Sequence, residues 1–232
     1  MIKQAVILAG GRGSRMKVGN ENDLLTRTPK PLIEVQGVPI IERMLRKLND
    51  YNIKIALVIN PVDEQKFRER LNKYNLIYCY QNDPLGTGNA LYSAKNFVTD
   101  DLFLVMMGDD ISSMDFDIIC KKESPTVFGF QVKEISGFGA LVLDSEGFAI
   151  EILEKQLTGK GIANTGIYLM PKKFFELYDK IQRDEKTGEY YLTHIVKLFY
   201  QLQLPFKVEM VDQWIGINTP NDLINAKKIS LN

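Results

Sequence analysis

The stretch AVILAGGRGSRMK, residues 5–17, joins an apolar run directly to a loop with three glycines, two arginines and a lysine. The run Ala5–Leu8 predicts a buried strand. Successive glycines let backbone N–H groups converge on one point, and Arg12, Arg15 and Lys17 add positive charge beside them. The stretch therefore predicts a strand that ends in an anion-binding loop, and an ordinary strand-to-helix turn is the alternative.

Outward from this stretch, apolar runs alternate with amphipathic segments. Strands are expected at residues 5–8, 55–59, 76–80 and 102–107, and helices at residues 39–48, 64–71 and 88–97. This alternation, with continuously apolar strands, is typical of a parallel sheet covered on both faces. It predicts an α/β, Rossmann-like, mixed and mainly parallel sheet with helices on both faces.

The second half of the chain is less regular and is expected as an insertion after the fourth strand. Strands are expected at residues 126–131, 140–143, 166–170 and 206–211, and helices at residues 172–181, 190–200 and 219–228. No internal repeat or linker interrupts the sequence. One domain is therefore predicted over residues 1–232, divided into a first half, 1–112, and a second half, 113–232.

Composition narrows the classes of function. The 232 residues hold 29 basic and 29 acidic side chains, so the broad positive surface of a nucleic-acid binder is not expected. No signal peptide is visible, and no apolar run approaches the roughly 18 residues of a membrane span. A cytoplasmic protein without a membrane partner is expected, and Cys79 and Cys120 are expected to be free thiols.

Two known phosphate-binding motifs can be tested against the glycine loop. The P-loop pattern GxxxxGK[ST] is absent, and the dinucleotide pattern GxGxxG fails at Met16, which disfavours an oxidoreductase. A second basic element is TPKPL, residues 28–32, where two prolines stiffen the chain around Lys30. Ligands bind beyond the carboxyl ends of parallel strands, where residues 10–15, 84–88 and 108–110 are expected to meet.

Together these segments resemble the signature of the sugar-1-phosphate nucleotidylyltransferases. The signature reads roughly LAxGxGxRxxP…PKPL, and here it stands as LAGGRGSRM followed by TPKPL. The resemblance continues in QNDPLGTGNAL, MGDD, GFGALVLD, IANTGIYLM, GEYYLTHIV and WIGINTPNDL. These motifs are most similar to those of UDP-N-acetylglucosamine and UDP-glucose pyrophosphorylase-type uridylyltransferase domains. The resemblance implies a nucleotide-binding half, 1–112, and a sugar-phosphate-binding half, 113–232.

The resemblance implies transfer of a nucleotidyl group, UMP from UTP in the first place, to glucose 1-phosphate or N-acetylglucosamine 1-phosphate. Pyrophosphate leaves and a nucleotide sugar forms. The alternatives are a thymidylyl- or cytidylyltransferase of the same fold, acting on a sugar, inositol or choline phosphate, and a non-catalytic nucleotide-sugar-binding regulatory relative. The attacking phosphate is already ionised at neutral pH, so the reaction needs alignment and charge neutralisation rather than a protein base.

The resemblance also implies the site residues. The implied catalytic residues are Arg15, Lys30 and Asp109, and the implied Mg²⁺ ligands are Asp109 and Asn218. The implied nucleotide-binding residues are Leu8, Ala9, Gly10, Gly11, Gly13, Gln81, Gly86 and Thr87. The implied sugar-binding residues are Gly139, Glu154, Lys155, Asn164 and Thr165. A nucleoside triphosphate and a sugar 1-phosphate are the expected partners, and a homo-oligomer is left open.

Three departures from the family pattern stand out. Residues 17–27 form an extra loop, because Arg15 and Lys30 are farther apart than is usual. Gly216 stands where many thymidylyl- and guanylyl-type members carry a second metal-binding aspartate. His194 replaces an aspartate after GEYYLT.

Overall fold

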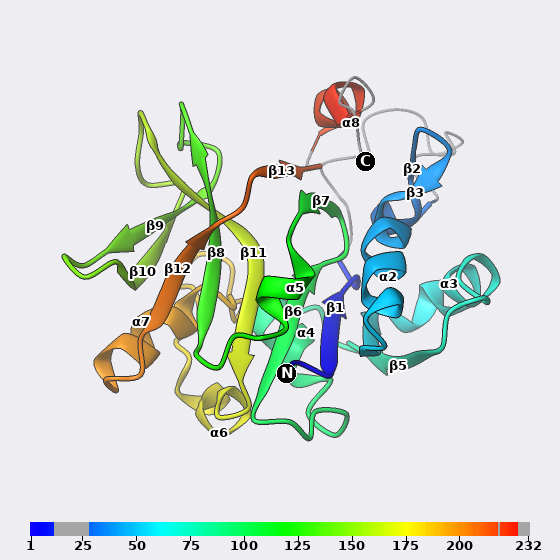
Figure 1. The fold of residues 1–232 in the computed structure, drawn as a ribbon, viewed down its shortest axis with the longest axis horizontal. Coiled ribbons are helices and arrows are strands. Elements are labelled where there is room, and N and C mark those ends of the chain that lie inside the picture. Colours follow the sequence, from blue (N-terminus) through cyan, green and yellow to red (C-terminus); the bar gives the residue numbers. More distant parts are fainter. Residues whose placement is uncertain (12–27, 218, 227–232) are drawn as a thin grey trace.

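A computed structural model describes residues 1–11, 28–217 and 219–226 and centres on a nine-stranded sheet (Figure 1). Its strands are β1 (Gln4–Leu8), β4 (Lys54–Ile59), β5 (Leu76–Tyr80), β6 (Leu102–Met107), β8 (Thr126–Val132), β9 (Gly139–Leu143), β10 (Phe148–Glu154), β11 (Gly161–Pro171) and β12 (Phe206–Met210). Their order is β5-β4-β1-β6-β11-β8-β12-β10-β9. Two ribbons accompany the sheet, β2 (Glu34–Val35) with β3 (Val38–Pro39) and β7 (Asp110–Ser113) with β13 (Gln213–Gly216).

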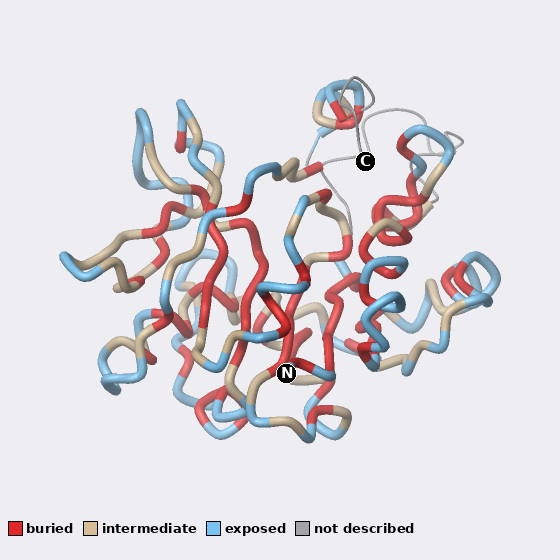
Figure 2. The backbone as a smooth tube through the Cα atoms, viewed as in Figure 1, coloured by how far each residue is buried: buried red, intermediate tan, exposed pale blue. Residues whose placement is uncertain are grey.

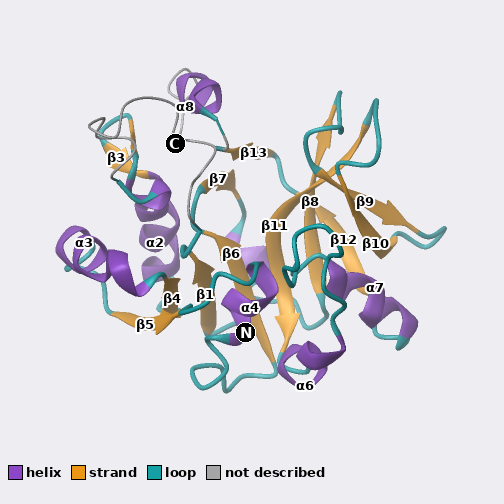
Figure 3. Cartoon of the chain, turned by 180° about the vertical axis from the view of Figure 1, so that it is seen from behind, coloured by secondary structure: helices purple, strands orange, loops and turns teal. Residues whose placement is uncertain are grey.

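Helices cover both faces of the sheet, as the opposite views of Figure 1 and Figure 3 show. One face carries α2 (Ile40–Asp50), α3 (Glu64–Arg70) and α5 (Phe116–Ile119), and the other carries α4 (Thr87–Tyr92), α6 (Phe174–Leu177) and α7 (His194–Gln201). The short segments η2 (Lys30–Leu32), η3 (Pro61–Asp63) and η4 (Tyr178–Lys180) and the last helix, α8 (Pro220–Ala226), complete the described elements. None of the described helices has the length and apolar character needed to cross a bilayer.

Strand β1 shows how the sequence produces two cores. Alternate side chains point to opposite faces, so Val6 packs with the residues of α4, α6 and α7 while Ile7 packs with those of α2, α3 and α5. Both faces are buried, and every residue of β1 is buried, as the central strands in Figure 2 show. A continuously apolar strand is the expected consequence of this double covering.

The predicted fold class is confirmed. Strands β5, β4, β1 and β6 are all parallel, and Leu8 stands opposite both Val58 and Met107. The second half continues the same sheet after β6: β11 runs antiparallel to both β6 and β8, and β12 runs parallel to β8. The sheet therefore passes through both predicted halves, with a parallel region followed by a mixed one.

Some predicted boundaries were wrong. The helix expected at residues 88–97 ends at Tyr92, where the Ser93 hydroxyl bonds back to the Asn89 carbonyl and tighter turns follow. The helix expected at residues 190–200 begins only at His194. Strand β10, which lies between the strands expected at residues 140–143 and 166–170, was not predicted.

A bend in β11 brings the second half against the end of β6. The pairing of β11 with β8 is irregular between Asn164 and Tyr168, and Gly166 within this interval has φ +72°. A Cβ at Gly166 would lie 2.5 Å from Cγ of Met107, the last residue of β6. Only glycine combines this backbone conformation with such close packing.

We expect Gly166→Ala to lower the free energy of unfolding by about 2 to 4 kcal/mol, since it adds left-handed strain to overpacking. Gly147→Ala is the matched control, because Gly147 has φ +85° but no atom within 4 Å of the added Cβ. The control should cost only about 1 to 2 kcal/mol. Urea unfolding measures both variants, and equal losses would contradict the packing argument.

Candidate active site

The carboxyl ends of the parallel strands meet in one row. Each ladder continues one residue past its strand: Ala9 N donates to Val58 O at 2.8 Å, and Gly108 N donates to Leu8 O at 2.9 Å. Gln81 N likewise donates to Ile59 O at 2.9 Å. The residues that follow β1, β5 and β6 therefore lie along the same edge, as the fold class requires of a ligand site.

The glycine loop begins with two contrasting residues. Gly10 is buried, and a Cβ there would lie 3.2 Å from Gln81 Oε1 and 3.3 Å from Asn60 N. Gly11 is exposed, with nothing within 4 Å of an added Cβ. The chain thus leaves β1 by close backbone packing and then opens to solvent. Gly13, Arg15 and the extra loop 17–27 lie outside the described residues.

An ion pair joins Lys30 to Asp109 at this edge. Lys30 is at the start of η2, and its Nζ lies 2.5 Å from Asp109 Oδ2 although 79 positions separate the two residues. Lys30 is only 8% exposed, so its charge is held in place and largely shielded from water. The Asp109 side chain is 32% exposed and so remains accessible. Two of the three residues implied as catalytic are thus in direct contact.

The neighbouring carboxylate, Asp110, points into the protein. Trp214 Nε1 donates to Asp110 Oδ2 at 3.2 Å, across the ribbon of β7 and β13. Burial raises the pKa of the Asp110 carboxyl, as does the charge of Asp109, while Lys30 lowers it. The ribbon carries the chain to Ile217, whose backbone also bonds to Asp110, and Asn218 follows outside the described residues. Asp109 is therefore the carboxylate that stays accessible.

The segment after β5 has a fixed amide. Gln81 is buried, and its Nε2 donates to Gly86 O at 2.9 Å and to Asn89 Oδ1 at 3.0 Å. A carbonyl oxygen can only accept, so Gly86 determines which end of the amide is nitrogen. The other end, Oε1, then lies against Gly10. The Thr87 hydroxyl is also engaged, since it accepts from Leu192 N at 2.9 Å.

The implied sugar-binding residues divide into two groups. In the first group, Gly139 pairs with Glu154 across β9 and β10, and a Cβ at Gly139 would lie 3.0 Å from Glu154 Oε1. Lys155 follows with φ +54° and donates its backbone N–H to Phe138 O at 3.0 Å. Glu154 and Lys155 are both exposed, so their charged side chains are accessible.

The second group, Asn164 and Thr165, lies at the bend of β11. Asn164 Nδ2 donates to the Tyr168 hydroxyl at 2.8 Å, and its Oδ1 accepts from Gly166 N at 3.1 Å. Thr165 is 1% exposed and donates its hydroxyl to Phe128 O at 2.7 Å. Both side chains thus form hydrogen bonds within the protein. Burial raises the pKa of Tyr168, and the charge of Glu154 adds to the shift.

Trp214 connects the residues at the strand ends with the first group of implied sugar-binding residues. The sequence analysis did not predict this connection. Its ring meets Phe138 edge-on at a centroid distance of 5.4 Å and Phe130 at 6.2 Å. The same indole bonds to Asp110, and the Phe138 carbonyl holds Lys155. The one signal in the sequence that could have pointed to this connection is that Trp214 is its only tryptophan.

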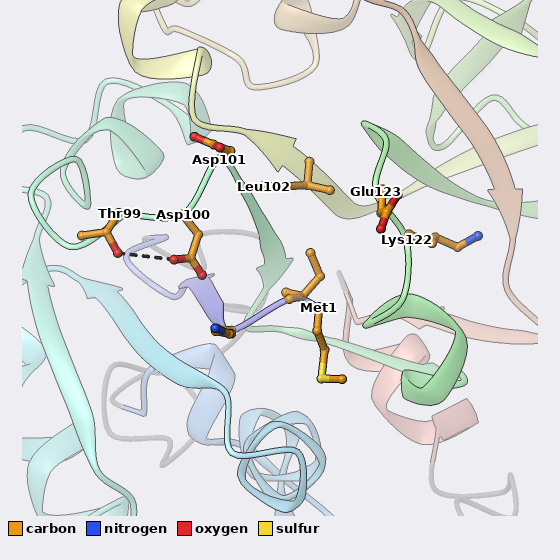
Figure 4. A pocket seen from close by; sticks show the side chains of 9 residues that line it. Met1, Thr99, Asp100, Asp101, Leu102, Lys122 and Glu123 are labelled. Atoms are coloured by element: carbon orange, nitrogen blue, oxygen red, sulfur yellow. Dashed lines mark hydrogen bonds between the residues drawn. The ribbon is translucent and has the colours of Figure 1, made fainter.

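A hollow of about 450 Å³ lies away from these residues, at the amino ends of β1 and β6. Figure 4 shows it between Met1, Asp100 and Lys122, with a hydrogen bond from Thr99 to Asp100. It contains none of the predicted site residues. The row of strand ends remains the candidate active site.

The residues at the strand ends are compatible with Mg²⁺, which binds through one or two carboxylates and keeps water and phosphate oxygens in its shell. Asp109 offers one accessible carboxylate. The described residues contain no group of three or more His, Cys, Asp or Glu side chains that could enclose a metal ion by themselves.

A profile of the nucleotidyl transferase family matches residues 4–232. The chain belongs to this family of transferase enzymes. The bifunctional protein GlmU of Methanocaldococcus jannaschii is 32% identical to this nucleotidyl transferase, over 98% of this chain and 54% of the relative. The bifunctional sugar-1-phosphate nucleotidylyltransferase/acetyltransferase of Sulfurisphaera tokodaii is 29% identical, over 98% of this chain and 55% of the relative. The chain thus spans about half the length of these relatives.

Solved structures share the fold of this nucleotidyl transferase. A putative glucose-1-phosphate thymidylyltransferase from Bacillus anthracis, in complex with a sucrose, has a TM-score of 0.81 and 26% identity. The match covers 100% of this chain and 98% of that one. HddC from Yersinia pseudotuberculosis, complexed with GMP-PN, has a TM-score of 0.74 and 24% identity, with 98% and 99% covered. The similarity to HddC is a similarity of fold alone.

We expect Trp214→Phe to lower the free energy of unfolding by about 1 to 2 kcal/mol, because the Asp110 carboxyl loses a partly buried donor. A double-mutant cycle with Asp110→Ala separates this bond from the ring packing. In the Asp110→Ala background, the tryptophan substitution should cost clearly less, as urea unfolding would show. Strictly additive losses would mean that the indole acts through packing only.

Proposed function

We propose that this chain is a sugar-1-phosphate nucleotidylyltransferase that transfers a nucleotidyl group, UMP from UTP in the first place, to a hexose 1-phosphate. The observation that carries the proposal is the ion pair of Lys30 and Asp109 at the strand ends, in the same row as Gly10 and Gln81. The name of the relative in Sulfurisphaera tokodaii supports the same reaction class. Glucose 1-phosphate and N-acetylglucosamine 1-phosphate are the first candidates as acceptors.

In the proposed reaction, a phosphate oxygen of the sugar phosphate attacks the α-phosphorus of the nucleotide. The bond from this phosphorus to the α–β bridging oxygen breaks, and pyrophosphate leaves with the electron pair. The Lys30 ammonium neutralises phosphate charge from a fixed position, and Arg15 adds a second cation. Fixed charges of this kind stabilise the transition state without reorganisation during the reaction. Asp109, with Asn218, would hold Mg²⁺, which supplies further charge neutralisation when bound.

Gln81 supports a preference among the bases. Its amide presents Oε1, an acceptor, because Gly86 and Asn89 take both amide protons. Uracil, thymine and guanine carry a ring N–H that can donate to this oxygen. Cytosine and adenine carry an unprotonated ring nitrogen at the matching position, and two facing acceptors repel. The amide therefore favours UTP, dTTP or GTP over CTP and ATP, which weakens the cytidylyltransferase alternative.

The sugar phosphate is proposed to bind between Glu154 and Lys155 on one side and the bend of β11 on the other. Glu154 can accept from sugar hydroxyls, and Lys155 can pair with the phosphate. The side chains of Asn164 and Thr165 are already bonded within the protein. These two residues are therefore proposed to contact the sugar chiefly through their backbone.

Pyrophosphate release tests this proposal, with UTP, dTTP, GTP, CTP and ATP each combined with glucose 1-phosphate, N-acetylglucosamine 1-phosphate, inositol phosphate and choline phosphate. We expect Mg²⁺-dependent release with a hexose 1-phosphate and with UTP ahead of CTP and ATP. Activity with a non-sugar phosphate alone would refute the sugar assignment. Binding of nucleotide sugar without any pyrophosphate release would favour the regulatory relative.

Asp109→Asn should lower kcat by at least about 100-fold, because it removes the accessible carboxylate from the charged site. Lys30→Met should have a similar effect on turnover. Lys122→Met is the control, since Lys122 pairs with Glu209 and lines the remote hollow. Circular dichroism checks that each variant folds. Wild-type turnover in Asp109→Asn would place the catalytic site elsewhere.

A further inference from the structure

The segment that reads the base is held from outside by the second half of the chain. We call residues 81–89 the base loop and residues 189–192 the clamp. Tyr190 N donates to Leu85 O at 2.8 Å, and Gly88 N donates to Tyr190 O at 2.7 Å. One clamp residue thus bonds through both of its backbone groups to the base loop, across more than a hundred positions of sequence.

The two backbones touch where the base loop has glycines. A Cβ at Gly86 would lie 2.6 Å from Tyr190 O and 2.9 Å from Cβ of Glu189. A Cβ at Gly88 would lie 2.9 Å from the same Tyr190 oxygen. Gly86 also has φ +96°, which other residues rarely adopt. The contact with the clamp by itself therefore requires the glycines of GTGNA.

A side chain completes the clamp. Between the two glycines, the Thr87 Oγ1 accepts a hydrogen bond from Leu192 N at 2.9 Å. The Tyr190 carbonyl accepts from Gly88 N rather than from His194 N, and the helix expected from residue 190 begins at His194. Thr87 follows directly on Gly86, whose carbonyl orients the Gln81 amide. The clamp is thus connected to the base-reading oxygen through two consecutive residues.

We propose that Thr87 is a positioning residue for base selection, and that the clamp of the second half sets the base preference of the first half. The hydroxyl fixes Gly86 against Tyr190, and the Gly86 carbonyl then keeps the Gln81 amide turned with Oε1 toward the base. The Gly86 carbonyl also accepts from Ala90 N at 3.0 Å, so without the Thr87 bond we expect it to shift together with the start of α4 and the amide to turn more freely. This inference rests on the proposed function, because it concerns the nucleotide of that reaction.

Thr87→Val tests the proposal, because valine keeps the shape of threonine and removes the acceptor. The matched control is Thr87→Ser, which keeps the hydroxyl. We expect Thr87→Val to lower the UTP-to-CTP ratio of kcat/KM by about tenfold, as loss of a partly buried hydrogen bond predicts. The KM for UTP should rise while kcat at saturation changes less than about threefold. Thr87→Ser should retain the wild-type ratio.

The ratio separates positioning from a general loss of stability, which would lower the amount of active enzyme without changing the ratio. A wild-type ratio in folded Thr87→Val would overturn the proposal. If Thr87→Val does not fold, Thr87→Ala removes the same hydroxyl without a β-branched side chain and is read by the same ratio.

Calorimetric binding of UTP and CTP to the wild type and to both variants gives a readout that does not depend on turnover. A protein that binds UTP in preference to CTP, but releases no pyrophosphate, would refute the proposed function and still allow the test of Thr87. The proposal on Thr87 then stands if the variant loses the binding preference and falls if it keeps it. A wild type that binds neither nucleotide would refute both.

Discussion

The parallel register of β1 with β4 and β6 is the constraint on which the other features depend. Leu8 stands opposite Val58 and Met107, so the residues after these strands emerge at one level. A slip by one residue would turn each side chain to the other face, where it would no longer fit the side chains packed there. The register that buries the apolar side chains is therefore the same register that collects the polar residues at one edge.

Charge at this edge is balanced inside the protein. A buried ammonium without a partner would be strongly unfavourable, and Asp109 supplies that partner for Lys30. The pair leaves one cation and one accessible carboxylate side by side, which are the charges that a phosphate and a divalent cation would meet. Asp110 adds no second open carboxylate, because Trp214 and the ribbon of β7 and β13 engage it.

The two halves share one sheet through the pairing of β11 with β6, and further contacts join them at the strand ends. Gly166 packs on Met107, Trp214 connects Asp110 with Phe138, and Tyr190 bonds to the base loop. Each of these contacts brings a segment of the second half to residues at or just after the end of a strand of the first. A change in the second half can therefore alter the geometry at this edge of the first half.

Local pattern in the sequence was sufficient to predict the parallel strands, the proline-framed Lys30 and the acidic end of β6, because each depends on neighbouring residues. Tertiary structure alone decided that Lys30 pairs with Asp109 and that Asp110 bonds to Trp214. It also decided that the side chains of Thr87 and Asn164 form hydrogen bonds within the protein. Tertiary structure also decided the position of strand β10 and the start of α7. Their partners lie far along the chain, and hydrogen-bond competition between distant segments leaves no periodic signal in either one.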